Sequence, residues 1–504
     1  MNEPTRWPVA AWVAGGVLFV LLATANGAGY RYGVSDQAFY IPVVTRALHP
    51  ADFPRDASLI DAEGRLMVLD DILAAVMKTT GVSLETLYLA GYLTSLALVW
   101  AGLVLIGTRV YRSPWATAAL AAAFTLRHRI PQTSANSFEP YFHPRMLAFA
   151  LGTLAVAAVL RRRSWIAVAL VALCAVIHIT TGLWFAVMIG VAVAVLDEQL
   201  RRLATAGALT AGLVLAWAAT LGPLRAANVT MDATWLQAVA SKDSLFATQW
   251  PLWAWAANVG LLALLWWAYR SRQRQGVARP EDAALAWGAT ALVALFVVTL
   301  PWVAAGWSLV VQFQISRIFW LVDAVATVYL IAVVADTGQY ARRTFAVRRP
   351  MIVALLLVAI AASRGAYVML AERPERPLFE ARIADSPWQD AMLWIRRQPR
   401  DVHVLADPGH SWKYGTSVRV SGERDVFLEE VKDSALAIYS RDVAARVVER
   451  TNALGDFTTL TADRANDLAR RYDLDYLVTT ADLPLPLAYR NEQFRVYLLA
   501  PQHD

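Results

Sequence analysis

Long apolar runs constrain this chain more than any other feature of its sequence. Eleven runs are candidates to cross a membrane, given about 20 residues for each crossing. They cover residues 8–28, 87–108, 114–126, 145–160, 165–177, 182–196, 203–222, 250–269, 283–303, 308–334 and 351–370. Only 17% of the residues are charged, against about 25% in soluble domains. The pattern predicts a polytopic membrane protein that is mainly α-helical.

The basic loops predict how the chain is oriented. Arginines gather in every second loop, at 109–112, 161–163, 201–202, 270–279 and 342–349, whereas the alternate loops are longer or mixed in charge. Cytoplasmic loops carry an excess of Lys and Arg, so we expect the N-terminus inside and the C-terminus outside. The first run is nearer to spanning length than to signal-peptide length, which favours an uncleaved anchor. A break at His178–Gly182 decides the parity, because a single crossing over 165–196 would invert the later loops.

Two parts are expected along the chain. A transmembrane domain covers 1–370, with a large first outer loop at 29–86, and a small α/β domain covers 375–504. The segment 371–377 between them is charged and broken by proline, as linkers often are. Beyond it, helical spacing at 388–398, 435–450 and 462–472 alternates with strand-like runs at 402–406, 418–420, 426–428, 476–478 and 494–499. This alternation predicts a small α/β domain on the outer face.

The sequence lacks the familiar motifs of soluble nucleotide-binding modules. It contains no Walker-type phosphate loop, no GxGxxG turn, and no CxxC, HExxH or GxSxG motif. Any group that the chain transfers is therefore expected to arrive on a lipid rather than on a nucleotide. The net charge of +6 comes largely from the loops that set membrane orientation, so no nucleic-acid partner is predicted.

One acid directly follows the first apolar run. Asp36 lies just before an amphipathic segment at 37–48, which could form a helix along the bilayer surface. A partly desolvated carboxylate there could act as a general base that deprotonates an acceptor hydroxyl. It could also be an N-cap or first-turn acid that stabilises the helix. Both interpretations of Asp36 stay open.

Paired carboxylates in the same outer loop are candidate metal ligands. They are Asp61, Glu63, Asp70 and Asp71. Divalent cations such as Mg²⁺ and Ca²⁺ take carboxylate oxygens, so a divalent metal cofactor is one interpretation. Paired acids are also common in solvated loops that bind nothing, which is the other.

A second outer loop is basic on the side where topology requires no basic residues. It carries Arg127, His128, Arg129, His143 and Arg145. These side chains could hold a phosphate or pyrophosphate through charge-assisted hydrogen bonds, or they could bind lipid headgroups or the outer domain. His178 and Arg317 are further candidates for a lipid phosphate, since charged groups within a membrane are costly and usually functional. A structural interhelical bond is the alternative for both, and Asp323 is expected to pair with another span.

These residues resemble those of a known family. The DxxxY pattern from Asp36 to Tyr40, followed by Pro50 and Asp56, resembles the first outer loop of GT-C superfamily glycosyltransferases. Within that superfamily, uncharacterised bacterial multi-span proteins are similar in three further segments. These are Trp388 with Trp394-Ile395-Arg396, Ser417-x-Arg419 and Glu430-x-Lys432. The resemblance covers most of the chain in layout, and its motifs are short.

The resemblance implies a function. The family implies a polyprenyl-phosphate sugar as donor, membrane lipid as surroundings, and transfer on the periplasmic face of a bacterial inner membrane. Asp36 would match the catalytic acid, and the acceptor would be a glycan, lipid or protein. The family's Asp-Glu pair is Asp36-Gln37 here, so a second carboxylate comes from elsewhere or metal binding is absent. Arg317 and the 127–145 cations would hold the leaving phosphate.

Two other functions remain open from the sequence. Breaks at 178–182 and 301–308 are typical of transporters that bind substrate at mid-membrane, so a transporter or flippase of a lipid-linked glycan is one alternative. A catalytically inactive GT-C-like scaffold that binds such a glycan is the other.

Overall fold

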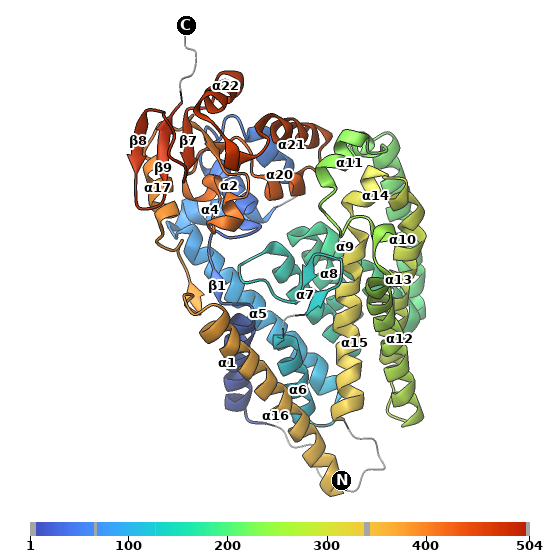
Figure 1. Ribbon diagram of the computed structural model, residues 1–504. Helices are drawn as coiled ribbons and strands as arrows, with labels where there is room; N and C mark the ends of the chain where they lie inside the picture. The colour runs from blue at the N-terminus through green and yellow to red at the C-terminus, as the bar shows by residue number, and fades with distance from the viewer. Residues whose placement is uncertain (1–6, 65–67, 127, 337–342, 500–504) are drawn as a thin grey trace. The chain divides into compact units, whose positions relative to one another are not determined.

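The computed structural model describes residues 7–64, 68–126, 128–336 and 343–499 (Figure 1). These residues are mainly helical, with a small region of sheet in the C-terminal part. They form two compact units. The helical unit comprises Met1–Tyr30, Ala90–Thr230 and Asp243–Phe379, and the sheet unit comprises Arg31–Leu89, Met231–Lys242 and Glu380–Asp504.

Eight helices of the described residues are long and apolar enough to cross a membrane. They are α1 (Val9–Asn26), α5 (Leu84–Val110), α9 (Ile179–Leu196), α10 (Glu198–Thr220), α12 (Leu252–Arg274), α13 (Pro280–Ala304), the segment Ser308–Ala335 that contains α14 (Ser308–Gln312) and α15 (Ile318–Ala335), and Arg348–Glu372, mostly in α16 (Arg343–Tyr367). The other three predicted runs form shorter helices, α6 (Pro114–Thr125), α7 (Pro144–Leu160) and α8 (Ser164–Ile177). Eleven crossings therefore remain a prediction, whereas the helical character of all eleven runs is confirmed.

The break at His178 separates two helices that pack against each other. His178 is extended, with φ −154° and ψ 102°, and its ring accepts a hydrogen bond from the Thr181 N–H at 3.3 Å. Gly182 lies against α8, where a Cβ would stand 2.3 Å from the Ala175 Cα. Only glycine allows this approach, so the segment 164–196 folds as a tight helical hairpin rather than as one continuous helix.

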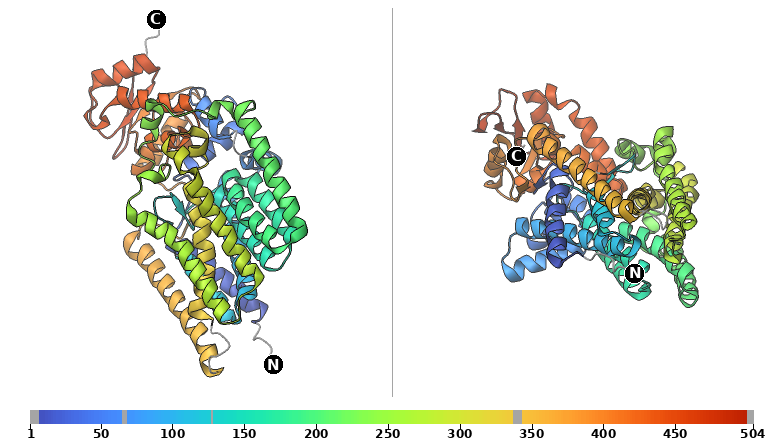
Figure 2. Two further views of the ribbon diagram at one scale, coloured as in Figure 1. Left: turned by 90° about the vertical axis from the view of Figure 1, so that its right-hand side faces the viewer. Right: turned by 90° about the horizontal axis from the view of Figure 1, so that it is seen from below.

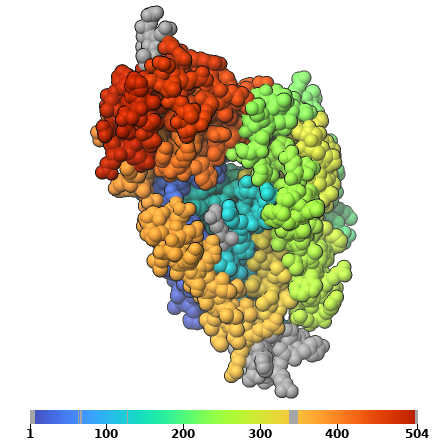
Figure 3. All heavy atoms as spheres, viewed as in Figure 1, coloured from blue at the N-terminus to red at the C-terminus, as the bar shows by residue number. Residues whose placement is uncertain are grey.

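Helices α12, α13 and α15 lie side by side along much of their length (Figure 2). Buried aromatic rings fill the space between these helices and their neighbours, such as Phe296 and Phe319, whose centroids are 4.9 Å apart. The outer surface of α12 and α13, green to yellow-green in Figure 3, exposes large apolar side chains. Trp253 and Trp267 are 59% and 51% exposed. Exposed apolar residues in such number are typical of a surface that faces lipid.

The sheet unit is built on five strands in the order β6-β5-β7-β9-β8. β5 (His403–Ala406) runs parallel to β6 (Asp425–Val426) and to β7 (Tyr476–Thr479). β9 (Arg495–Leu498) is antiparallel to β7 and to β8 (Leu487–Arg490). Successive strand residues point to opposite faces. Val404 therefore packs with α17 (Pro387–Arg396) on one face, whereas Leu405 packs with α21 (Arg441–Leu454) and α22 (Ala462–Tyr472) on the other.

Most of the elements expected beyond residue 387 are present, and three differ. The predicted strand at 418–420 is wrong, because Val418–Ser421 forms the helical turn α19. Ser417 caps that turn, and its Oγ accepts the Arg419 N–H at 3.1 Å. The single helix expected over 435–450 is divided into α20 (Glu430–Leu436) and α21, since Ser440 caps the second helix. Strand β8 was not predicted.

The segment predicted as the first outer loop is helical and belongs to the sheet unit. It contains α2 (Gln37–Leu48), α3 (Ala57–Gly64) and α4 (Leu69–Thr80). α19 packs against α2, and α20 packs against α3. Every residue from Gln37 to Val44 is buried, so α2 is a packed helix rather than one that lies exposed along a bilayer. Asp36, at its start, is thus placed by the C-terminal part of the chain.

Candidate functional site

Asp36 forms an ion pair with a lysine from the C-terminal segment. The Nζ of Lys432, in α20, donates to Oδ1 of Asp36 at 2.9 Å and lies 3.5 Å from the Ser35 hydroxyl. Asp36 occupies the N-cap position of α2, but its side chain makes no capping hydrogen bond. Its carboxylate keeps 29% of its surface exposed. Asp36 therefore makes no capping hydrogen bond, although its carboxylate still lies at the start of α2, where a negative charge favours the helix dipole.

Lys432 is buried between a carboxylate and two aromatic rings. Its side chain is only 4% exposed, which is unusual for lysine unless it is paired. Its ammonium also lies over two aromatic rings, 5.8 Å from the Phe39 centroid and 5.4 Å from the Trp412 centroid. Phe39 belongs to α2 and Trp412 to the short helix α18 (His410–Lys413). Three separate segments thus surround one positive charge.

A second lysine lies close to the same pair. The Nζ of Lys242, just beyond α11 (Ala233–Val239), donates to the Val431 carbonyl at 2.9 Å. Burial and the nearby charge of Lys432 lower the pKa of Lys242 to about 8. The chain has only four lysines, at 78, 242, 413 and 432. Two of them therefore share the surroundings of Asp36.

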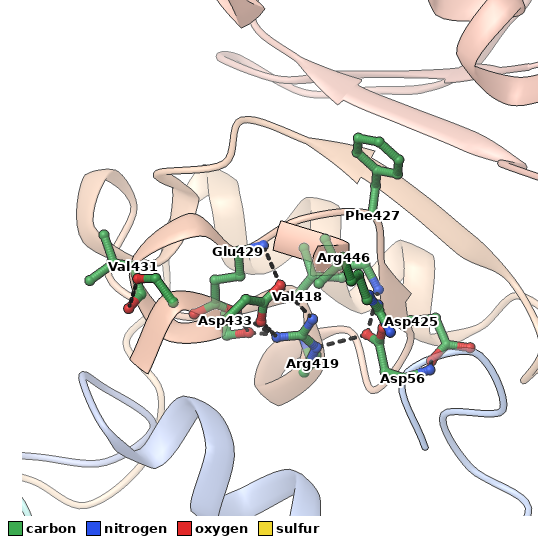
Figure 4. Close-up of polar contacts among 12 residues, drawn as sticks. Asp56, Val418, Arg419, Asp425, Phe427, Glu429, Val431, Asp433 and Arg446 are labelled. Atoms are coloured by element: carbon green, nitrogen blue, oxygen red, sulfur yellow. Dashed lines mark hydrogen bonds and ion pairs between the residues drawn. The ribbon is translucent and has the colours of Figure 1, made fainter. Parts of the chain in front are cut away.

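A buried ionic chain includes Asp433, the residue that follows Lys432 in α20 (Figure 4). Arg419 donates to both carboxylate oxygens of Asp433, at 2.6 and 3.2 Å, and through Nε to Asp56 at 2.7 Å. The side chains of Arg419, Asp433 and Asp56 are 2%, 1% and 0% exposed. Arg446 pairs with the other oxygen of Asp56. The result is a continuous Asp56–Arg419–Asp433 chain that joins the 50–56 segment to α20.

Glu429 adds a second branch to the ionic chain. It accepts a hydrogen bond from the Ser417 hydroxyl, and its Oε2 lies 3.7 Å from both the His410 ring and Arg419. Burial opposes its ionisation, but its contacts with His410 and Arg419 lower the pKa of Glu429 to about 2. The branch therefore ties the segment that carries Trp412 to the start of α20.

The charges of the chain are strongly shifted by their neighbours. Burial alone would raise the pKa of the Asp56 carboxyl, but the guanidinium groups of Arg419 and Arg446 hold it well below its usual range. Asp425 accepts the backbone N–H groups of Arg55 and Asp56, at 3.1 and 2.9 Å. Its burial, together with the negative charge of Asp56, raises the pKa of Asp425. Two neighbouring carboxylates thus titrate far apart.

The helical unit brings four of the predicted phosphate-binding residues together. His143 caps α7 and His178 caps α9, and their rings lie 6.1 Å apart. The charges of Arg145 and Arg317 also act on His178. Arg145 is buried, pairs with Glu139 at 3.1 Å and lies 6.0 Å from the centroid of the Trp320 ring. Two helix N-termini and several basic side chains therefore meet at one place, which is favourable for an anion.

The remaining cations of the 127–145 loop are placed differently. The Nδ1 of His128 lies 2.8 Å from the Asp323 carboxylate, in α15, and its other ring nitrogen contacts the Ala123 carbonyl. Burial opposes the charged ring, but the Asp323 hydrogen bond raises the pKa of His128. Asp323, expected to pair with another span, is thus paired with this loop. Arg129 is exposed on the short strand β2 (Arg129–Ile130), and Arg127 lies outside the described residues.

The donors near Asp36 do not fit a divalent cation. An ammonium already occupies its Oδ1, and the side-chain oxygen of Gln37 accepts the Gly33 N–H at 2.6 Å. Asp61 is paired with Arg46 at 3.0 Å, Asp70 is buried on α4 and Asp71 is exposed. The side chain of Glu63 lies outside the described part. Within residues that the structure describes, no three His, Cys, Asp or Glu side chains form a group suited to a metal.

Sequence reasoning missed the polar residues that organise the sheet unit. Arg419 and Lys432 belong to the short motifs that resemble a known family, but no role was predicted for either, and no motif includes Lys242. Scarcity of lysine is no signal by itself, because two of the four lysines, Lys78 and Lys413, are exposed. Partners such as Lys432 and Asp36 are separated by 396 residues, so no local pattern could have joined them.

Comparison with known proteins gives a fold-level likeness only. No protein-family model matches the sequence, and no curated protein matches it. The apo crystal structure of the Archaeoglobus fulgidus oligosaccharyltransferase is similar, with a TM-score of 0.48, 12% identity, 94% of this chain covered and 69% of that chain. The structure of the archaeal oligosaccharyltransferase AglB from the same organism, in complex with an inhibitory peptide and a dolichol-phosphate, has a TM-score of 0.48 and 13% identity. The match covers 93% of this chain and 69% of that chain. The crystal structure of the Archaeoglobus fulgidus oligosaccharyltransferase in complex with Zn and sulfate has a TM-score of 0.40 and 14% identity. The match covers 93% of this chain and 67% of that chain.

Proposed function

We propose that the chain is a glycosyltransferase that moves a sugar from a polyprenyl-phosphate donor to a glycan, lipid or protein acceptor on the periplasmic face. The observation that carries this proposal is the placement of Asp36. Its carboxylate is partly exposed, does not cap its own helix, and is fixed by a buried ammonium at 2.9 Å. A carboxylate held in this way is suited to accept a proton from a substrate.

For a hydroxyl acceptor, the proposed step balances as follows. Asp36 takes the proton from the acceptor O–H while the acceptor oxygen attacks the anomeric carbon of the sugar. The bond between that carbon and the phosphate oxygen breaks, and its electron pair leaves with the polyprenyl phosphate. Asp36 then returns its proton to water. No oxidant and no nucleotide is needed, in keeping with the absence of nucleotide-binding motifs from the sequence.

We assign the phosphate of the donor to the basic residues of the helical unit. His143, Arg145 and His178 stand at or near the N-termini of α7 and α9, and Arg317 acts on His178. Positive charge aimed at a leaving phosphate stabilises the negative charge that develops on it. The candidates Arg127, His128 and Arg129 belong to the same loop, although His128 would have to release Asp323 to bind an anion.

The location of the reaction follows from the loop charges. Five short basic loops in alternation predict a cytoplasmic N-terminus. That orientation would put Asp36 and the 375–504 segment on the periplasmic side of a bacterial inner membrane. Cysteine-accessibility labelling tests this, because Cys174 is the chain's single cysteine and is buried. A membrane-impermeant reagent should label a cysteine introduced at Asp390 from outside.

Replacement of Asp36 by Asn tests the base assignment. Polyprenyl-phosphate sugars carrying a radiolabel are supplied to membranes that contain the chain, and transfer to lipid, glycan or protein is measured. Loss of a general base lowers the rate by about 10² to 10⁴. Asp390→Asn is the matched control, since Asp390 is an exposed acid at the start of α17 in the same unit. Transfer by Asp36→Asn at the parental rate would refute the assignment.

The same assay separates the alternatives. A transporter or flippase of a lipid-linked glycan would move the intact lipid across vesicles without cleaving it. The helical hairpin at His178 is the feature that keeps this alternative in view, since helices broken within a membrane often mark transport sites. An inactive scaffold would bind the lipid without either outcome. Cleavage of the sugar-phosphate bond is expected only of the enzyme.

A further inference from the structure

We propose that the Lys432 ammonium orients the Asp36 carboxylate, and that the buried Asp56–Arg419–Asp433 chain holds Lys432 in place. The structural part of this proposal concerns the sheet unit alone. Its consequence for the rate rests on the proposed function. In that reaction Lys432 acts through Asp36, so it is a positioning residue rather than one that takes part in the proton transfer.

The Lys432 ammonium is buried and directed inward. A buried ammonium loses its hydration and remains charged only if other groups replace the lost water. Here Asp36 provides a carboxylate oxygen at 2.9 Å, and Phe39 and Trp412 present their ring faces. A lysine that merely covered a surface would extend its ammonium into water. This one directs its ammonium inward, toward the acid at the start of α2.

Ion pairs connect Lys432 to the N-terminal segment that carries Asp36 by a second route. Asp433 follows Lys432 directly in α20 and is bound at both oxygens by Arg419. Arg419 also binds Asp56. Asp56 lies in the same N-terminal segment as Asp36, 20 residues further along. The path therefore begins and ends in the same N-terminal segment, running from Asp36 through Lys432, Asp433 and Arg419 to Asp56. A shift of α20 relative to this segment would break the buried ion pair between Arg419 and Asp56 or Asp433.

Arg419 holds Asp433 in a fixed direction. A guanidinium is planar and binds a carboxylate with two parallel hydrogen bonds, which fixes direction as well as distance. α20 has only seven residues, and a helix this short gains little rigidity on its own. Its orientation is therefore set by outside contacts, of which the Arg419–Asp433 fork is buried and directly adjacent to Lys432.

The structural test uses the four lysines of the chain as reporters, and the fifth signal that Arg419→Lys or Arg471→Lys adds is identified by its absence from the parent spectrum. The full chain is produced with ¹³Cε-labelled lysine in detergent or nanodiscs, and each signal is assigned by Lys→Arg replacement. Asp36→Asn should move the Lys432 signal and leave that of Lys78 in place. In an Arg419→Lys or Asp433→Asn background, the same Asp36→Asn change should move the Lys432 signal by less than half as much. Arg471→Lys, at the exposed pair with Glu449, is the matched control.

Two results would overturn the structural part. One is a Lys432 signal that does not respond to Asp36→Asn in the otherwise unchanged chain. The other is an undiminished response in both the Arg419→Lys and Asp433→Asn backgrounds. Arg419→Lys keeps the charge and loses the fork, so it is expected to fold, and Asp433→Asn provides an independent route. Size-exclusion chromatography and melting temperature confirm that each variant is folded.

The kinetic test separates positioning from a merely structural role. Lys432→Met should lower kcat by about 10²-fold, the cost of a catalytic group misplaced by roughly 1 Å, with KM for the donor nearly unchanged. Lys432→Arg should recover part of kcat, and Lys78→Met should leave it unaltered. Equal falls in Lys432→Met and Lys432→Arg, or a change confined to KM, would overturn positioning. A wild-type chain without any transfer would refute the proposed function, while the lysine signals decide the placement of Lys432.

Discussion

Arg419 binds Asp433 through both terminal nitrogens, Nη1 to Oδ1 at 2.6 Å and Nη2 to Oδ2 at 3.2 Å. The same guanidinium reaches Asp56 through Nε. One side chain thus bridges two carboxylates that come from segments 377 residues apart, counting from Asp56 to Asp433. Burial of an ion pair is costly, so such a group often serves to specify one arrangement rather than to add net stability. The sheet unit depends on this arginine to align its N-terminal and C-terminal segments.

Arg419→Met should be strongly destabilising. It leaves Asp56 and Asp433 without their shared cation in a setting where both are 0–1% exposed, and breaking a buried pair costs about 3–5 kcal/mol. Thermal unfolding of the purified full chain, followed by tryptophan fluorescence, measures the loss. Arg471→Met removes an arginine from an exposed pair and should cost less than about 1 kcal/mol. Equal melting temperatures for the two variants would contradict the prediction.

The sequence predicted the helical character of the membrane runs well, and the reason is physical. A backbone in lipid must satisfy its own hydrogen bonds, so an apolar run such as 283–303 has almost no choice but to be helical. The break at His178 was also visible, because a polar residue followed by Gly182 interrupts the apolar pattern. The number of crossings was not, since lengths such as those of α6 and α8 do not decide between a short span and a re-entrant helix.

The sheet unit was less readable from its sequence. Val418-Arg-Val420 alternates like a strand, yet Ser417 caps it as a helical turn and Arg419 is turned into a buried ionic chain. Tertiary contacts overrode the local preference there. Asp36 could be singled out from its position after the first run. Its partner could not, because the Asp36–Lys432 pair forms only when two distant segments fold together.

Acid should destabilise the sheet unit through Glu429. Burial would raise the pKa of Glu429 above its usual 4.5, but its contacts with His410 and Arg419 lower that pKa to about 2 in the folded chain. The folded state therefore favours the ionised form, and this contribution is present above pH 4.5 and lost as the pH falls toward 2. The shift corresponds to a stabilisation on the order of 3 kcal/mol. The melting temperature should fall between pH 5 and 3, and Glu429→Gln should flatten that fall.

Asp425 should act in the opposite direction and serves as the comparison for Glu429. Burial and the charge of Asp56 raise its pKa, so the folded state binds its proton more tightly than the unfolded state. That contribution is present at low pH and is lost as the pH rises through the raised value. Asp425→Asn should therefore steepen the acid-dependent loss of stability that Glu429→Gln reduces. Variants that change the profile in the same direction would contradict both assignments.

Lys242 should lose its charge near pH 8. Burial and, to a smaller extent, the charge of Lys432 lower the pKa of Lys242 to about 8, whereas the charge of Asp36 raises it. Because the folded pKa lies below the ordinary 10.5, stability should rise as the pH increases from 8 to 10.5. A ¹³Cε-lysine titration of the full chain measures the midpoint. Lys432→Met should raise it and Asp36→Asn should lower it, whereas unchanged midpoints would show that Lys242 does not sense the pair.

Removal of divalent metal should leave sugar transfer intact. The Lys432 ammonium already binds Oδ1 of Asp36, and the neighbouring residue is Gln37, whose amide oxygen accepts the Gly33 N–H, rather than a second carboxylate. Membranes that contain the chain are treated with excess EDTA and assayed with a polyprenyl-phosphate sugar, then assayed again after addition of Mg²⁺ or Mn²⁺. Comparable rates in all three conditions are expected, with a metal-dependent enzyme in the same membranes as proof that chelation was complete. A fall in rate of about tenfold or more in EDTA, reversed by either metal, would mean that a metal ion rather than Lys432 serves Asp36. That result would refute the role of Lys432 and the conclusion that the side chains around Asp36 do not fit a divalent cation.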